Sequence, residues 1–133
     1  MGLTWTNTIQ CRFVESQSPT AATDPVLLWT NGGPGCSGLL GLLGENGPFR
    51  TQANGTLRAF EHSWTQAANV IFVEQPLFTG YSLSGQATDS HTDDAVNAER
   101  LVTFVRRWLE KFPEYAQRDL YLGGESCKWC ATG

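Results

Sequence analysis

The sequence predicts an α/β domain with a mostly parallel sheet and helices on its faces. Three observations support this class: short apolar runs that suit buried strands, a long stretch with the period of an amphipathic helix, and the alternation of the two along the chain. The length of 133 residues fits one domain or part of one. The aromatic content is high for this length, with five Trp, seven Phe and three Tyr. Such rings must mostly be buried, against one another or against chain that is not part of this sequence, so an incomplete hydrophobic core is one expectation.

The first half of the chain holds two expected strands and a short helix. Residues 9–15 and the apolar run 26–29 are expected to be strands, joined by a polar connection rich in Ser, Thr, Ala and Pro. A glycine-rich run, 31–35, follows the second strand. Residues 36–43 are apolar nearly all round, so we expect a short buried helix there despite its glycines.

The second half holds a buried strand, a long helix and a last strand. Residues 69–74 carry consecutive apolar side chains and predict a parallel strand covered on both faces. Across 92–112 apolar residues recur every three to four positions, which predicts an amphipathic helix that ends at Pro113. Residues 119–123 predict the last strand. Because ligands of parallel α/β sheets bind at the carboxyl ends of strands, we expect the functional residues there.

Charge and hydropathy argue against two classes of partner. The net charge is −4, from 9 basic and 13 acidic residues without blocks, so neither nucleic acid nor an anionic membrane is an expected partner. No run of 18 apolar residues occurs, and the first residues have neither a basic opening nor an apolar stretch. We therefore expect no membrane span and no signal peptide in this chain.

The four cysteines, Cys11, Cys36, Cys127 and Cys130, permit three full pairings, and the sequence does not choose among them. The spacing of Cys127 and Cys130 occurs in redox and zinc sites, but zinc needs four ligands and a redox pair needs its own surrounding fold. An incidental pair is the favoured interpretation. No metal and no other cofactor is expected.

One glycosylation sequon is present. It starts at Asn54 and lies in a Gly- and Asn-containing polar stretch that predicts a surface turn. The sequon favours the secretory route.

A strand that runs directly into Gly124-Glu-Ser126 has the layout of a nucleophile elbow, in which a sharp strand-to-helix turn lifts the Ser126 hydroxyl above the sheet. The match to the G-x-S-x-G pattern is imperfect, because its fifth position is Lys128. The alternative is a surface turn with a helix-capping serine.

The glycine-rich run 31–35 supplies backbone amides just after a buried strand, where an α/β hydrolase holds a developing oxyanion. The alternative is a plain glycine-rich turn. Together with Ser126, this run places two parts of one catalytic machine in the expected chain order.

These motifs and further stretches closely resemble the serine carboxypeptidase family, peptidase family S10, in order from about Phe13 to Ser126. The matching stretches are residues 29–39, 45–48, 64, 68–70, 74–76, 108–115 and 124–126. The resemblance implies that residues 1–133 form an incomplete α/β-hydrolase domain. It also implies proteolysis of peptide or protein substrates with a free C-terminus.

The resemblance implies a role for each matching position. Ser126 would be the nucleophile that forms an acyl-enzyme, and the backbone amides of Gly33 and Cys127 would form the oxyanion hole. The grip on the substrate's C-terminal carboxylate would consist of Asn31, the amide of Gly32, Glu45 and Glu125. Because two ionised glutamates repel a carboxylate, we expect substrate binding to be favoured at acid pH.

The chain departs from the family after the nucleophile. The catalytic acid and histidine of α/β hydrolases follow the serine, yet none of the seven residues after Ser126 is Asp, Glu or His. His62 and His91 precede it and are expected in exposed loops. We therefore expect no turnover from this chain alone, and interpret residues 127–133 as an atypical, foreign tail.

A second departure concerns residues 77 and 78. Leu77 and Phe78 replace small residues of the family in a segment near the pocket, which puts substrate preference in doubt. The resemblance also implies that Cys36 pairs with a cysteine in a missing part of the protein, and would thus be free here.

Three classes of function remain open. The first is a serine-type carboxypeptidase, with an acyltransferase on the same scaffold as its nearest rival. The second is a non-catalytic binder of peptide C-termini, and the third is a small dithiol protein that uses Cys127 and Cys130. By resemblance the protein follows the secretory route to the vacuole, the lysosome or the outside of the cell.

Overall fold

Two fully buried strands, β2 (Val26–Thr30) and β5 (Asn69–Val73), form the centre of a four-stranded sheet. The computed structural model describes residues 7–126. The two strands run parallel, with Val26 opposite Asn69 and Thr30 opposite Val73. Continuous apolar runs suit this position, because a central parallel strand is covered on both faces. Both expected strands are confirmed.

The flanking strands complete the order β1-β5-β2-β6. β1 (Cys11–Val14) pairs antiparallel with β5, and β6 (Leu120–Gly124) pairs parallel with β2. The sheet is therefore mostly parallel, as predicted, with β1 as its antiparallel edge.

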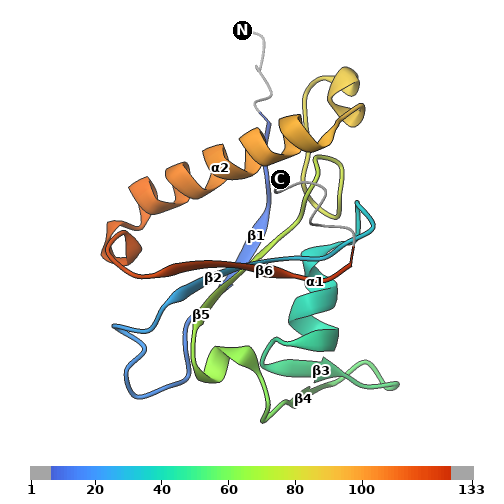
Figure 1. The fold of residues 1–133 in the computed structure, drawn as a ribbon. Coiled ribbons are helices and arrows are strands. Elements are labelled where there is room, and N and C mark those ends of the chain that lie inside the picture. Colours follow the sequence, from blue (N-terminus) through green and yellow to red (C-terminus); the bar gives the residue numbers. More distant parts are fainter. Residues whose placement is uncertain (1–6, 127–133) are drawn as a thin grey trace, which may run out of the picture.

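Helix α2 (Asp94–Lys111) covers one face of the sheet (Figure 1). The Asp93 side chain accepts a hydrogen bond from the Val96 amide at 2.8 Å, which caps the helix, and a 3₁₀ turn (Pro113–Tyr115) follows it. Its buried side chains pack on alternate residues of the central strands. The cluster consists of Val26, Leu28, Ile71, Val73, Leu101, Trp108 and Tyr115.

The opposite face carries α1 (Gly38–Leu40), the π-helical turn Gly41–Glu45, and a hairpin of β3 (Phe49–Thr51) and β4 (Leu57–Ala59) (Figure 1). A 3₁₀ turn, Trp64–Gln66, leads back to β5. The buried cluster on this face consists of Leu27, Trp29, Val70 and Phe72. The helix expected at 36–43 thus starts later and runs on to Glu45, and it is only partly buried, since Leu40 is 53% exposed.

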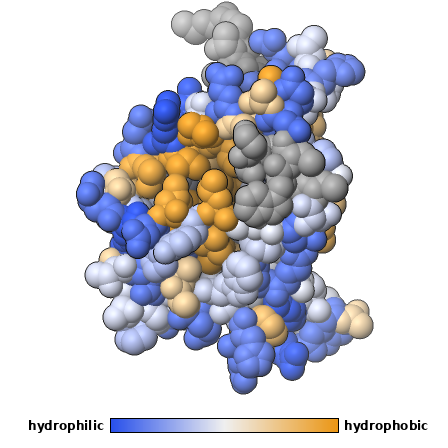
Figure 2. All heavy atoms as spheres, viewed as in Figure 1, coloured by the Kyte–Doolittle hydropathy of each residue, from blue (hydrophilic) through white to orange (hydrophobic). Residues whose placement is uncertain are grey.

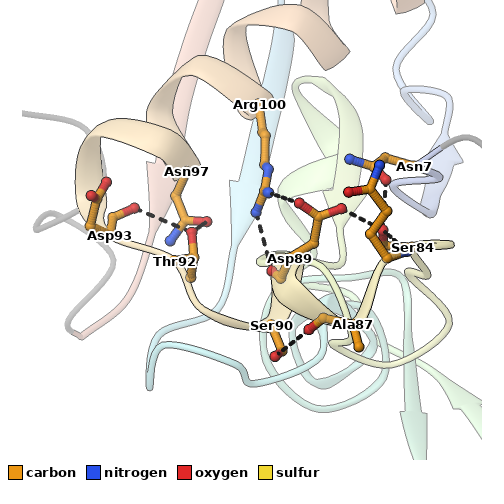
Figure 3. A network of polar contacts seen from close by, with 10 residues as sticks. Asn7, Ser84, Ala87, Asp89, Ser90, Thr92, Asp93, Asn97 and Arg100 are labelled. Atoms are coloured by element: carbon orange, nitrogen blue, oxygen red, sulfur yellow. Dashed lines mark hydrogen bonds and ion pairs between the residues drawn. The ribbon is translucent and has the colours of Figure 1, made fainter.

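A polar network fixes the segment before α2, including the 3₁₀ turn Ala87–Ser90 (Figure 3). The Arg100 guanidinium on α2 contacts Oδ1 of Asp89 at 2.7 Å. The Ser84 hydroxyl lies 2.5 Å from Oδ2 of Asp89 and 2.7 Å from the Asn7 side-chain oxygen. These bonds join the start of the described chain to α2.

The outer side of β6 lacks a cover within residues 7–126. β6 pairs with β2 alone in the described part of the chain, and Leu120, Tyr121 and Leu122 are 41%, 56% and 54% exposed. Figure 2 shows an apolar patch on this side of the molecule, over α2 and β6. Val102 of α2 is also exposed. The described residues therefore leave part of the apolar surface of the sheet unburied, in line with an unfinished core.

Candidate active site

The carboxyl ends of three neighbouring strands meet at one edge of the sheet. Thr30 lies opposite both Val73 and Gly124. The residues that follow these three positions are Asn31, Glu74 and Glu125. The sheet register thus brings together polar residues that stand far apart in the sequence.

Asn31 is buried at this edge, 4% exposed, and its side chain is hydrogen-bonded to three other residues. Its side-chain oxygen accepts hydrogen bonds from Nε1 of Trp29 at 3.2 Å and from the Gly41 amide at 3.1 Å. Its Nδ2 donates to Oε1 and Oε2 of Glu45, at 3.0 and 3.1 Å. The donors fix the orientation of the amide, and the amide in turn holds the exposed Glu45 carboxylate beside the strand end.

Arg50 borders the same turn. Its guanidinium donates to the Glu45 backbone oxygen and lies 3.5 Å above the Phe60 ring. Loss of hydration lowers the pKa of Arg50, and the neighbouring Glu45 carboxylate acts in the opposite direction. Arg50 thus fixes the main chain at Glu45, a contact that no motif in the sequence indicated.

The glycine-rich loop leaves an amide free at Gly33. Gly33 is exposed and has φ +117, and a Cβ there would lie 3.1 Å from the Gly35 nitrogen. Within the described chain the Gly33 amide donates no hydrogen bond, whereas the Cys36 amide donates to the Gly32 oxygen at 3.0 Å. Cys36 is exposed, and its thiol forms no disulfide within residues 7–126.

Glu74 anchors the far end of this loop. Its carboxylate is buried, 2% exposed, accepts a hydrogen bond from the Ser37 hydroxyl, and accepts another from the Tyr81 amide at 2.8 Å. Ser37 also caps α1 through the Leu39 amide at 3.2 Å. The matching stretch 74–76 was recognised in the sequence, but no role was assigned to Glu74; a carboxylate directly after a buried strand was the available signal.

Ser126 stands two residues beyond β6 in a left-handed backbone conformation, with φ +59. Few non-glycine residues adopt this region, and a nucleophile elbow is one place where they do. Ser126 and Glu125 are both exposed, and within residues 7–126 neither side chain makes a hydrogen bond. A strained backbone just after a strand is one feature of a nucleophile elbow, and the residues that would complete the predicted strand-to-helix turn lie outside the described residues.

The structure brings some of the expected site residues into contact and others only to the same edge. Asn31 and Glu45 touch, while Glu125 follows the neighbouring strand without bonding to either of them in the described part of the chain. Cys127, the second expected oxyanion donor, lies outside the described residues, as do Lys128 and Cys130. His62 and His91 are exposed outside the helices and strands, as expected.

Residues 7–126 contain neither a metal site nor a membrane-spanning helix. No group of three or more His, Cys, Asp or Glu side chains there could hold a metal ion. None of the described helices is long and apolar enough to cross a membrane.

A mostly parallel sheet flanked by helices, with a glycine loop and a strained serine at adjacent strand ends, defines an α/β hydrolase. The chain belongs to the serine carboxypeptidase family, whose family model matches residues 11–127.

Individual relatives agree with this assignment. Serine carboxypeptidase-like 36 from Arabidopsis thaliana is 45% identical over 86% of this chain and 24% of its own length. P-(S)-hydroxymandelonitrile lyase from Sorghum bicolor is 41% identical over 86% of this chain and 23% of its own length. The crystal structure of a prohormone-processing carboxypeptidase from Saccharomyces cerevisiae superposes with a TM-score of 0.74 at 28% identity, covering 89% of this chain and 26% of that one. The chain therefore spans about a quarter of the length of these relatives.

Proposed function

We propose that the protein to which these residues belong is a serine-type carboxypeptidase that removes C-terminal residues from peptides through an acyl-enzyme. One observation carries the proposal: the Gly33 amide, which donates no hydrogen bond within residues 7–126, and the strained Ser126 follow the paired ends of β2 and β6. An attacking hydroxyl and an oxyanion donor must flank one carbonyl group, and adjacent strand ends supply that proximity.

The proposed reaction runs in two steps. Oγ of Ser126 attacks the carbonyl carbon of the last peptide bond, and the oxyanion is held by the amides of Gly33 and Cys127. The C–N bond breaks, the C-terminal residue leaves as an amine with the serine proton, and water then cleaves the ester and restores the hydroxyl.

Both steps need a base. His62 and His91 are exposed loop residues that precede the nucleophile, so we assign the base to neither of them. We therefore propose that the 133-residue chain by itself is inactive.

Specificity for the free C-terminus is assigned to Asn31, the Gly32 amide, Glu45 and Glu125. Support comes from the Asn31–Glu45 contact and from the position of Glu125 on the neighbouring strand end. A substrate carboxylate beside glutamates binds best when a proton is shared among them, so we propose tighter binding at acid pH.

The test compares a peptide with its C-terminal amide, using the full polypeptide encoded by the transcript. We expect kcat/KM for the free acid to exceed that for the amide by at least about 100-fold, because the neutral amide offers one acceptor oxygen where the acid offers two and cannot share a proton with the glutamates. Ser126→Ala should abolish turnover, whereas Ser90→Ala, a serine of the turn before α2, should not. Equal rates for acid and amide would refute the proposal.

An acyltransferase and a non-catalytic binder remain the alternatives. The Sorghum relative, named as a lyase, indicates that this scaffold accommodates chemistry other than peptide hydrolysis. Product analysis with an ester donor and an added alcohol acceptor identifies an acyltransferase by transfer to the acceptor. Calorimetry identifies a binder, which would show heat with the peptide acid, none with the amide, and no product.

We also propose that Asn54 carries an N-linked glycan and that the protein follows the secretory route. Asn54 is exposed between β3 and β4, and its side-chain oxygen accepts bonds from the Thr56 amide at 3.1 Å and the Thr56 hydroxyl at 2.7 Å. This local turn presents the side chain to solvent. A loss of mass on endoglycosidase treatment, absent from both Asn54→Gln and Thr56→Ala, is the expected result; no change in the unsubstituted protein would refute it.

A further inference from the structure

The segment that follows β5 forms one wall of the candidate active site. Glu74, at its start, accepts the Ser37 hydroxyl at the end of the glycine loop. Further along, Thr79 is buried, and its Oγ1 lies 3.9 Å from the position of a Cβ built on Gly35. Residues 74–79 therefore lie against the loop that carries the proposed oxyanion donor.

Phe78 occupies a strained position in this wall. Its φ is +69, and within residues 7–126 the only other non-glycine residue with positive φ is Ser126. A bulky aromatic residue in the left-handed region costs conformational free energy, and such outliers gather at functional sites. The Phe78 amide donates to the Ser82 oxygen at 2.9 Å, so the turn holds the backbone in this conformation.

The described fold gains little from the phenyl ring itself. Phe78 is 43% exposed and belongs to neither buried cluster, whereas the preceding Leu77 is 5% exposed and fills the inner side of the turn. Glycine, or an asparagine that tolerates positive φ, would meet the backbone requirement at lower cost. Strain together with an exposed ring indicates that the ring serves a ligand.

We propose that Phe78 is a specificity-determining residue: its phenyl face contacts an apolar side chain at or next to the C-terminus of the bound peptide. This inference rests on the proposed carboxypeptidase function. Burial of roughly 50 Å² of apolar surface between ring and ligand corresponds to a five- to tenfold preference for an apolar over a polar side chain.

The test uses the full polypeptide encoded by the transcript and four blocked tripeptides. Ala-Ala-Leu and Ala-Ala-Ser vary the last residue, and Ala-Leu-Ala and Ala-Ser-Ala vary the one before it. The ratio of kcat/KM within each pair, or of Kd where there is no turnover, is measured for Phe78→Asn, Phe78→Gly and Phe78→Tyr. Phe49→Asn is the matched control, because Phe49 is also 43% exposed but lies on β3 with ordinary backbone angles.

We expect the Leu-to-Ser preference in one pair to fall about five- to tenfold in Phe78→Asn and Phe78→Gly. It should persist in Phe78→Tyr, which keeps an aromatic face, and in Phe49→Asn. Relief of backbone strain should raise the melting temperature of Phe78→Gly and Phe78→Asn by a few degrees.

Unchanged Leu-to-Ser ratios in both Phe78→Asn and Phe78→Gly would overturn the inference. If, in addition, the melting temperature of these variants is lower than that of the unsubstituted protein, the ring packs against other parts of the protein and does not serve a ligand. The proposed carboxypeptidase function has its own test. It is refuted if the unsubstituted protein does not distinguish peptide acids from amides, and the role of Phe78 is then refuted as well.

Discussion

Nδ2 of Asn31 donates to both carboxylate oxygens of Glu45, at 3.0 and 3.1 Å, and so joins the end of a buried strand to the last residue of a π-helical turn. The other end of the Asn31 side chain accepts two hydrogen bonds, from Trp29 and Gly41. The whole amide is therefore satisfied, and a buried group of this kind contributes strongly to a unique local geometry.

Asn31→Asp should destabilise the protein at neutral pH by about 2–3 kcal/mol, because a second carboxylate then faces Glu45 without a donor between them. The loss should shrink at acid pH, where a proton is shared by the pair. Denaturant unfolding at pH 7 and pH 4.5 measures both. Adding Glu45→Gln should recover most of the stability at pH 7, and an equal loss at both pH values would contradict this explanation.

Gly41→Ala should disturb the hydrogen bonds that Trp29 and Gly41 donate to Asn31. A Cβ at Gly41 would lie 2.4 Å from Nε1 of Trp29 and 3.0 Å from Oδ1 of Asn31, so we expect a cost of about 1–3 kcal/mol and weaker binding of peptide acids. Gly44→Ala is the control in the same turn, since nothing lies within 4 Å of its added Cβ. Similar unfolding midpoints for the two variants would show that the contact does not matter.

The sequence predicted the central elements because their patterns are strong. Four apolar residues in a row at β5 and a three-to-four-residue period at α2 leave few alternatives, and the strand order then placed Ser126 near the glycine loop. Glu45 was assigned by family resemblance, and its bond to Asn31 is a tertiary contact that spans 14 positions.

Other features could not be read from the sequence. The β3–β4 hairpin has short, exposed strands of mixed composition, so no periodicity marks it. The left-handed backbone at Phe78 contradicts the preference of its residue type, and only the surrounding turn imposes it. The burial of Glu74 likewise depends on Ser37 and Tyr81, which arrive from other segments of the chain.

Trp108→Ala should be among the most destabilising single substitutions. The ring is 6% exposed and lies 5.2 Å from the ring of Phe13, 4.9 Å from Phe112 and 5.3 Å from Tyr115. Loss of this packing should cost about 3–5 kcal/mol in the free energy of unfolding. Trp64→Ala, whose ring is 48% exposed, should cost clearly less by the same denaturant measurement; the reverse order would argue against the core described here.

Asp24 should make stability depend on pH. Hydrogen bonds from Ser16, Ser18 and Thr20 hold the pKa of the Asp24 carboxyl below its ordinary value of 3.8. Since the folded-state pKa is depressed, the stabilisation is present above pH 3.8 and is lost as pH falls through the folded value. Asp24→Asn should therefore lower the melting temperature at pH 7 and converge with the unsubstituted protein as pH falls through the folded-state pKa. Asp119→Asn, which removes an exposed carboxyl, is the control; a constant gap at every pH would contradict the assignment.

The uncovered β6 has a consequence for the newly made chain. When residues 7–126 have folded, β6 pairs with β2 while Tyr121 and Leu122 face water, and one row of its backbone amides and carbonyls has no partner within those residues. Such a strand edge recruits any other extended segment within reach. In the newly made chain this edge of β6 is therefore the place at which aggregation by strand pairing would start.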